Sequence, residues 1–228
     1  MLIAGLQKVT LLDFPGKLAC TVFAPGCNFR CPFCHNASLV TEKSELIPES
    51  EFFEFLESRK GRLQGVCVTG GEPTLQRDFK DFLAKIKSMG FLVKLDTNGY
   101  APEKLKEAVN GGLADYVAMD IKNSLQKYGE TVGIADFNTE PIKESVKFLL
   151  SGAVDYEFRT TVVRELHTAQ DIEEITALID GAKRYFLQGF VDSGDLIGEG
   201  LSGYDKKEME NLLKVAKMRL SVTELRGM

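Results

Sequence analysis

The stretch GVCVTGGEPTLQRDFKDFLAKIKSMGFLVKL, residues 65–95, contains two short apolar runs that flank an amphipathic segment. Gly65 to Thr69 and Phe91 to Leu95 are rich in β-branched and other apolar residues, which is typical of buried strands. Between them, Leu75 to Met89 has apolar residues at helical spacing, and Gly90 follows where a positive φ ends a helix at little cost. A strand, a helix and a second strand in this order predict two parallel strands of one sheet.

The same alternation continues on both sides of this stretch. Further strands are predicted at Leu18 to Ala24, Tyr116 to Ile121, Tyr156 to Val163 and Arg184 to Phe190. Helices are predicted at Pro48 to Ser58, Pro102 to Asn110, Glu140 to Leu150, Ala169 to Ala182 and Asp205 to Val215, and a last extended piece at Arg219 to Leu225. Six such units predict an α/β fold, either an incomplete barrel or a doubly wound sheet, and 228 residues suit a single domain over residues 1–228.

Composition limits the partners and the location. The formal net charge is -5, so the chain has no excess of positive charge to bind the phosphate backbone, and nucleic acid is a poor candidate partner. The first residues lack a basic region followed by an apolar segment, and no run of about eighteen apolar residues occurs. We therefore expect a cytoplasmic protein with no membrane partner. The glycine-rich loop from Gly189 to Gly203 predicts either unusual backbone angles or a mobile lid.

The segment PGCNFRCPFCHN, residues 25–36, places Cys27, Cys31 and Cys34 close together directly after the first predicted strand. Thiolates are the soft ligands that iron–sulfur clusters and zinc prefer. Three cysteines would hold a four-iron cluster and leave one iron free to bind a substrate, which is the interpretation we favour. Cys20 and Cys67 lie inside predicted strands and are expected to be buried, inert thiols.

Three other interpretations of this segment stay open. Cys27, Cys31, Cys34 and His35 could hold a structural zinc ion, although adjacent Cys34 and His35 make that geometry awkward. The string C-x-x-C-H also matches a haem-attachment sequence, and the thiols could simply be buried without a ligand. The other histidine, His167, is expected to lie in a solvated loop.

The spacing C-x₃-C-x₂-C resembles the signature of the radical S-adenosylmethionine superfamily, and the resemblance extends over nearly the whole chain. Gly70, Gly71, Glu72 and Pro73 match that superfamily's Gly-Gly-Glu-Pro motif, which binds the methionine amino group of S-adenosylmethionine. Glycines let the backbone approach a ligand closely, and a carboxylate suits an ammonium group. The resemblance implies a partial (β/α)₆ barrel that holds a four-iron, four-sulfur cluster and S-adenosylmethionine.

Two further segments resemble the glycyl-radical-enzyme activating enzymes, namely LDTNG at residues 95–99 and MDIK at residues 119–122. The resemblance implies a monovalent-cation site beside the S-adenosylmethionine carboxylate, formed by Asp96, Thr97 and Asp120, with the Ala118 carbonyl as a further candidate ligand. The alternative is that the two carboxylates only cap helices or turns. By the same resemblance Arg159 and Gln188 are cofactor contacts, with Gln188 standing where some activators have a histidine.

The string TLLDFPGK, residues 10–17, and Cys34-His35-Asn36 look closest to the activating proteins of anaerobic ribonucleoside-triphosphate reductase. This implies that a flavodoxin or ferredoxin supplies an electron, that S-adenosylmethionine is cleaved reductively, and that a hydrogen is removed from a glycine of that partner. Two alternatives remain: a radical enzyme acting on a small molecule such as a deazapurine precursor, and a non-catalytic iron–sulfur electron carrier.

Overall fold

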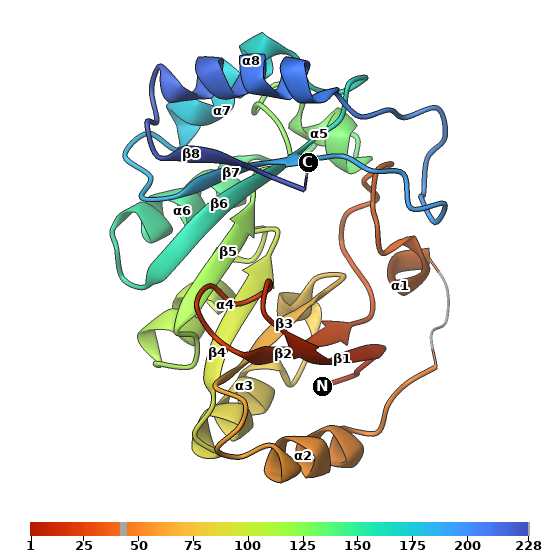
Figure 1. Ribbon diagram of the computed structural model, residues 1–228, viewed down its shortest axis with the longest axis vertical. Helices are drawn as coiled ribbons and strands as arrows, with labels where there is room; N and C mark the ends of the chain where they lie inside the picture. Colours follow the sequence, from red (N-terminus) through yellow and green to blue (C-terminus); the bar gives the residue numbers. More distant parts are fainter. Residues whose placement is uncertain (42–44, 228) are drawn as a thin grey trace.

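The computed structural model describes residues 1–41 and 45–227, and its strands form one curved sheet in chain order (Figure 1). β1 (Gly5–Thr10) is antiparallel to β2 (Ala19–Ala24), and every later pair is parallel. The remaining strands are β3 (Gly65–Gly70), β4 (Leu92–Thr97), β5 (Tyr116–Asp120), β6 (Asp155–Val162), β7 (Tyr185–Gly189) and β8 (Thr223–Arg226). A strand order that never reverses is that of a barrel, which excludes the doubly wound alternative. Since β1 and β8 are not neighbours in this sheet, the barrel is open on one side.

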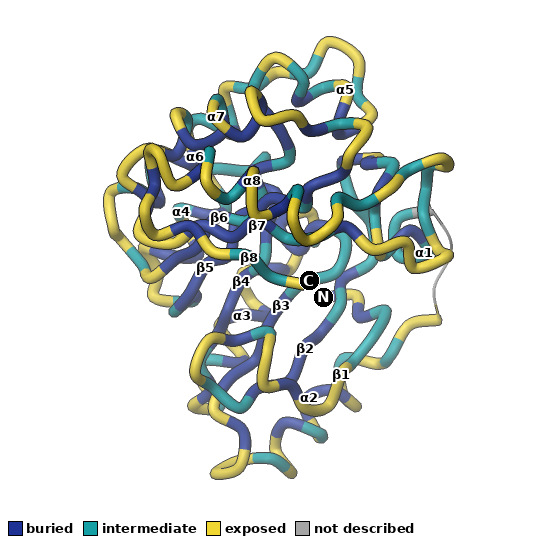
Figure 2. The backbone as a smooth tube through the Cα atoms, turned by 45° about the horizontal axis from the view of Figure 1, so that its top comes forward, coloured by how far each residue is buried: buried dark blue, intermediate teal, exposed yellow. Residues whose placement is uncertain are grey.

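Helices connect the parallel strands and cover the outer face of the sheet (Figure 1). They are α2 (Glu49–Ser58), α3 (Phe79–Ser88), α4 (Pro102–Asn110), α6 (Glu140–Leu150), α7 (Ala169–Leu178) and α8 (Lys206–Lys217), with three short pieces, α1 (Ala37–Thr41), η1 (Pro73–Leu75) and α5 (Tyr128–Val132). Two helix starts have a clear local cause, because Thr168 and Asp205 form capping boxes with the residues three positions later. Figure 2 shows the central strands buried beneath helices whose outer faces are exposed.

Several predicted boundaries are wrong. The strand β1 was not predicted because its residues are mostly exposed or half-buried and so lack an apolar run. The predicted helix from Leu75 to Met89 is split, since η1 ends at Leu75 and α3 begins only after Asp78. The helix predicted to end at Ala182 ends at Leu178. The short helices α1 and α5 were also not predicted, because five residues are too few to show a helical period.

The other strand and helix predictions agree with the structure to within a few residues, and the last extended piece is β8, parallel to β7. The burial predicted for Cys20 and Cys67 is confirmed, because both are fully buried. In the described residues, no helix is long and apolar enough to cross a membrane.

Candidate functional site

A cavity of about 190 Å³ lies at the carboxyl ends of β2 to β6. This is the end at which parallel α/β barrels place their ligand sites. Nine of the predicted site residues line it: Cys27, Cys31, Cys34, Gly70, Gly71, Asp96, Thr97, Asp120 and Arg159. Three others, Glu72, Pro73 and Gln188, are absent from its wall. The fold therefore gathers most of the predicted residues from five separate segments into one place.

The cysteine loop, residues 25–36, forms one wall of the cavity. The Cys31 side chain is buried, whereas Cys27 and Cys34 are half-buried. Arg30 N–H donates to the Val132 carbonyl at 2.8 Å, and this bond ties the loop to α5. Burial raises the pKa of the Cys27 thiol and raises that of Cys31 to about 12. These thiols would therefore ionise only beside a strong positive charge, such as iron supplies.

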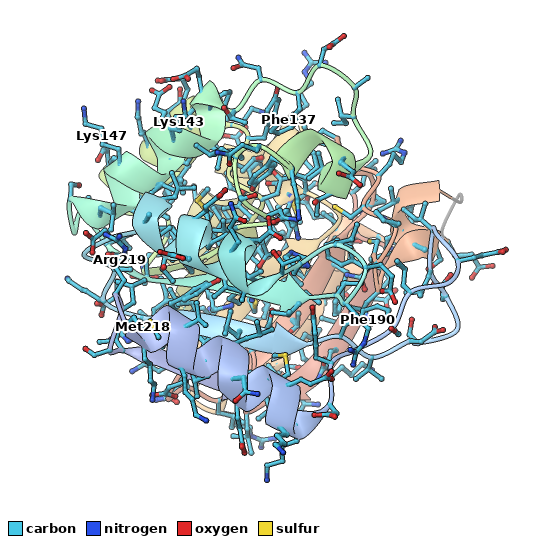
Figure 3. The ribbon with its side chains drawn as sticks, turned by 90° about the horizontal axis from the view of Figure 1, so that it is seen from above. Phe137, Lys143, Lys147, Phe190, Met218 and Arg219 are labelled. Carbon is cyan, nitrogen blue, oxygen red and sulfur yellow. The ribbon has the colours of Figure 1, made fainter. Side chains whose placement is uncertain are left out.

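The geometry does not support a zinc site in this loop. Among the described residues, no group of three His, Cys, Asp or Glu side chains is placed to hold a single metal ion. The imidazole of His35 instead lies against the ring of Phe190, which Figure 3 labels, with 5.6 Å between the ring centroids.

The glycines after β3 permit a close backbone approach. A Cβ on Gly71 would lie 2.0 Å from the Gly26 carbonyl oxygen, and Gly70, at φ +116°, would bring a Cβ to 2.4 Å from the backbone of Ala24. Gly26 belongs to the cysteine loop, and Ala24 comes just before it. Glycine is thus needed here to pack one loop of the site against the other, besides any contact with a ligand.

The structure places Glu72 differently from the role predicted for its carboxylate. The side chain is buried and accepts hydrogen bonds from Thr74 N–H at 3.1 Å, Thr74 Oγ1 at 2.6 Å, Thr97 Oγ1 at 2.9 Å and Asn98 N–H at 2.6 Å. Burial nevertheless raises the pKa of Glu72. The carboxylate therefore fastens the β3 loop to the end of β4, and of this motif only Gly70 and Gly71 line the cavity.

Arg159 joins the two predicted aspartates. Its Nη1 donates to Asp96 Oδ2 at 3.0 Å and its Nε donates to Asp120 Oδ1 at 2.9 Å. Burial opposes ionisation of both carboxyls, but Arg159, together with Lys94 at Asp96 and Lys122 at Asp120, outweighs it and lowers the pKa of each. The alternative that Asp96 and Asp120 only cap helices or turns does not describe these contacts. We call Lys94, Asp96, Asp120, Lys122 and Arg159 the charged cluster.

Gln188 lies one strand beyond the cavity. It is half-buried on β7 and pairs in register with Thr161 of β6, which does line the cavity. The wall ends at β6, so Gln188 lies outside it, and its contact with the cofactor stays a prediction. Pro73 is buried at the start of η1, where its ring suits the first position of a helical turn.

Among the wall residues that received no role from the sequence are Lys122 and Asn98. Lys122 lines the cavity and donates to Asp120 Oδ2 at 2.9 Å, and Asn98 lines it and donates to the Asn28 side chain of the cysteine loop at 2.8 Å. Each follows a predicted aspartate by two positions. In an extended chain, residues two apart lie on the same face, and that spacing could have identified both.

His167 is fully buried, so the expected solvated loop is wrong. Its Nδ1 accepts a hydrogen bond from Val163 N–H at 3.1 Å, which leaves Nε2 to donate to the Lys122 carbonyl at 2.8 Å. Burial lowers the pKa of this imidazole. A neutral His167 thus holds the backbone of Lys122 beside the cavity.

Acidification is expected to destabilise the wild-type protein more steeply than a His167→Gln variant. An unfolded histidine has a pKa of about 6.5, and the folded pKa of His167 is lower. The unfolded chain therefore binds this proton more readily, so the stabilising contribution is complete above about pH 6.5 and is lost as the pH falls toward the folded pKa. Urea unfolding of both proteins at several pH values between about 5 and 8 measures the difference. Equal slopes would contradict the assignment.

The loop after β7 lies against the cysteine loop (Figure 1). Gly198 N–H donates to the Pro32 carbonyl at 2.8 Å, and a Cβ on Gly198 would lie 2.5 Å from Pro32 Cβ. Gly194 and Gly200 have positive φ values of 77° and 72°. Of the two interpretations of this glycine-rich loop, unusual backbone angles describe Gly194 and Gly200, and Gly198 permits a close contact with Pro32.

Comparisons with known proteins agree with this architecture. The chain is 33% identical over 223 residues to a putative glycyl-radical enzyme activating enzyme of Methanocaldococcus jannaschii, a match that covers 95% of this chain and 92% of the relative. It is 31% identical over 170 residues to a GTP 3′,8-cyclase of Helicobacter pylori, which covers 71% of this chain and 50% of the cyclase.

A radical SAM methyltransferase from Sphaerobacter thermophilus has the same fold, with a TM-score of 0.75 over 96% of this chain and 68% of that one at 14% identity. Residues 21–179 match the family model of the radical SAM superfamily. The protein therefore belongs to the radical S-adenosylmethionine superfamily, whose members are enzymes that do radical chemistry with a four-iron, four-sulfur cluster and S-adenosylmethionine.

Proposed function

We propose that this protein is the activating enzyme of a glycyl-radical enzyme, and that its partner is anaerobic ribonucleoside-triphosphate reductase. The observation that carries the proposal is one cavity, at the mouth of an open barrel, that is lined by three cysteine thiols and by four of the five residues of the charged cluster. The full-length similarity to a putative activating enzyme supports the same class of substrate.

The donor set of the cavity fits the family's cofactors. Cys27, Cys31 and Cys34 are soft ligands that would hold the four-iron cluster, and the Gly70 and Gly71 backbone and the charged cluster would orient S-adenosylmethionine beside it. When bound, the cluster would pass an electron from a flavodoxin or ferredoxin to S-adenosylmethionine, and this reductive cleavage would supply the radical chemistry that removes a hydrogen atom from a glycine of the partner. We place this chemistry in the cytoplasm, where such electron donors occur.

The open side of the barrel supports a protein substrate. The sheet has no pairing between β1 and β8, so a loop of a large partner could reach the cavity between them. The choice of reductase rests on Cys34-His35-Asn36, which line the cavity, and on the segment from Thr10 to Lys17. That segment lies at the opposite end of the strands, where Phe14 packs against Tyr116 with 6.2 Å between ring centroids. No residue of this segment lines the cavity, so the segment supports the choice of ribonucleotide reductase only by its resemblance to that group of activating proteins.

A second candidate function is radical chemistry on a small heterocycle. The similarity to a GTP 3′,8-cyclase favours it, although that match spans only half of the cyclase. The non-catalytic electron carrier is set aside, because the family consists of enzymes.

Incubation of the cluster-loaded protein with S-adenosylmethionine, dithionite and anaerobic ribonucleotide reductase is expected to produce a doublet radical signal on the reductase. The main splitting of that signal should collapse when the reductase contains glycine deuterated at the α-carbon, because the splitting comes from the remaining α-hydrogen. Anaerobic electron paramagnetic resonance measures both results.

Two controls separate the candidates. A reductase with its radical glycine replaced by alanine should gain no signal. If no glycyl-radical enzyme gains a radical while a purine nucleotide is consumed together with S-adenosylmethionine, the small-molecule candidate is correct and the activating function is wrong.

A further inference from the structure

Lys94 is a buried lysine placed directly behind the cavity wall. It lies on β4 two residues before Asp96, so the two side chains share the inner face of the sheet. Only 1% of Lys94 is exposed, and its ammonium group donates to Asp96 Oδ1 and lies 3.8 Å from the Cys67 sulfur. Asp96 lines the cavity, whereas Lys94 is not part of its wall. Lys94 therefore reaches the cavity wall through its contact with Asp96.

Every carboxylate oxygen of the charged cluster already has a cationic donor. Asp96 Oδ1 is bound by Lys94 and Asp96 Oδ2 by Arg159. Arg159 also binds Asp120 Oδ1, and Lys122 binds Asp120 Oδ2. Two carboxylates thus face three cationic side chains, and the cluster has one excess positive charge.

This charge balance does not suit an additional monovalent cation at Asp96, Thr97 and Asp120. A sodium or potassium ion would enter a group that is already positive, in which every carboxylate oxygen already accepts from an ammonium or guanidinium donor. An anionic group is the better complement, because a single carboxylate would bring the cluster to neutrality. The carboxylate of S-adenosylmethionine is such a group.

We propose that Lys94 is the permanent counter-cation of Asp96, and that S-adenosylmethionine binding therefore needs no sodium or potassium ion. This inference rests on the proposed function, since it concerns the binding of that cofactor. Lys94 is a positioning residue, which keeps Asp96 ionised and oriented toward Arg159. The ligand carboxylate then pairs with the excess positive charge of Lys122 and Arg159 at the cavity wall.

The wild-type protein provides the first test. We expect the dissociation constant of S-adenosylmethionine for the cluster-loaded protein to agree within about twofold in sodium, potassium and choline buffers of equal ionic strength, because about twofold is less than 0.5 kcal/mol. Anaerobic equilibrium dialysis measures it. An affinity about tenfold lower in choline, which is too large to replace an alkali ion, would overturn the inference and leave the proposed function intact. Absence of binding in all three buffers would overturn both.

Three variants provide the second test. Lys94→Met should weaken S-adenosylmethionine binding by about tenfold or more in choline, equivalent to about 1.4 kcal/mol, and potassium or sodium should restore part of the affinity by taking the vacated place beside Asp96. Lys94→Arg should retain cation independence. The control Lys80→Met removes an exposed lysine paired with Glu107 and should behave like the wild type. If Lys94→Met binds with unchanged affinity in choline, the inference is wrong, and if it does not fold, the wild-type comparison decides.

Discussion

Replacement of Cys27, Cys31 or Cys34 by alanine is expected to abolish the iron–sulfur cluster. The anaerobically reconstituted wild-type protein should contain about four irons and four sulfides per chain, held by three thiolates. Each of these cysteines lines the same cavity, and no other cysteine does. Loss of one ligand should reduce the iron content and the charge-transfer absorbance of the cluster to near the background, as chemical iron analysis and visible spectroscopy would show.

The remaining two cysteines are matched controls. Cys20→Ala and Cys67→Ala remove thiols that are fully buried inside strands and outside the cavity wall. Both variants should retain the full iron content, although each loses some stability because a buried sulfur is deleted. Cluster loss in either control, at a temperature where the variant is folded, would overturn the assignment of the three ligands.

Arg159→Met is expected to cost about 1.5–3 kcal/mol of folding free energy, because two half-buried carboxylates each lose a charged donor while keeping a lysine partner. Asp96 and Asp120 each lose a guanidinium donor at about 3 Å. The same variant should lose S-adenosylmethionine binding. Urea unfolding of the reconstituted protein measures the first effect, and equilibrium dialysis measures the second.

The cost should depend on pH in a defined direction. Arg159 lowers the pKa of both aspartates, so their stabilising contribution is present above the unfolded value of about 3.9 and is lost as the pH falls through the folded pKa. The difference between wild type and Arg159→Met should therefore be largest near neutral pH and smaller in acid.

Arg219→Met is the matched control for this variant. Arg219, which Figure 3 labels, is half-exposed after α8 and lies 3.5 Å from Asp180, so its loss should cost no more than about 1 kcal/mol. Equal costs for the two arginines would contradict a special role for Arg159.

Local sequence patterns sufficed for much of the barrel and for the place of the cysteines. The run from Gly65 to Val68 has no polar side chain because a strand buried on both faces needs none, and the helices repeat apolar residues because only one of their faces is covered. The half-exposed β1 carries no such pattern, so its place in the sheet follows only from its pairing with β2. The three-cysteine spacing lies within one loop and was therefore readable directly.

Only the tertiary structure decided where the polar side chains point and which groups they pair with. Glu72 is turned inward by donors 25 and 26 residues away, and His167 is buried against a carbonyl 45 residues away. Lys94 and Asp96 are neighbours on one strand, but only the fold brings Arg159, 63 residues from Asp96, to the same carboxylate. Periodicity reports which face of an element is covered. A buried ionic group is stable only beside a group of opposite charge. Which group that is depends on the register between strands that are distant in sequence, and no local pattern contains that register.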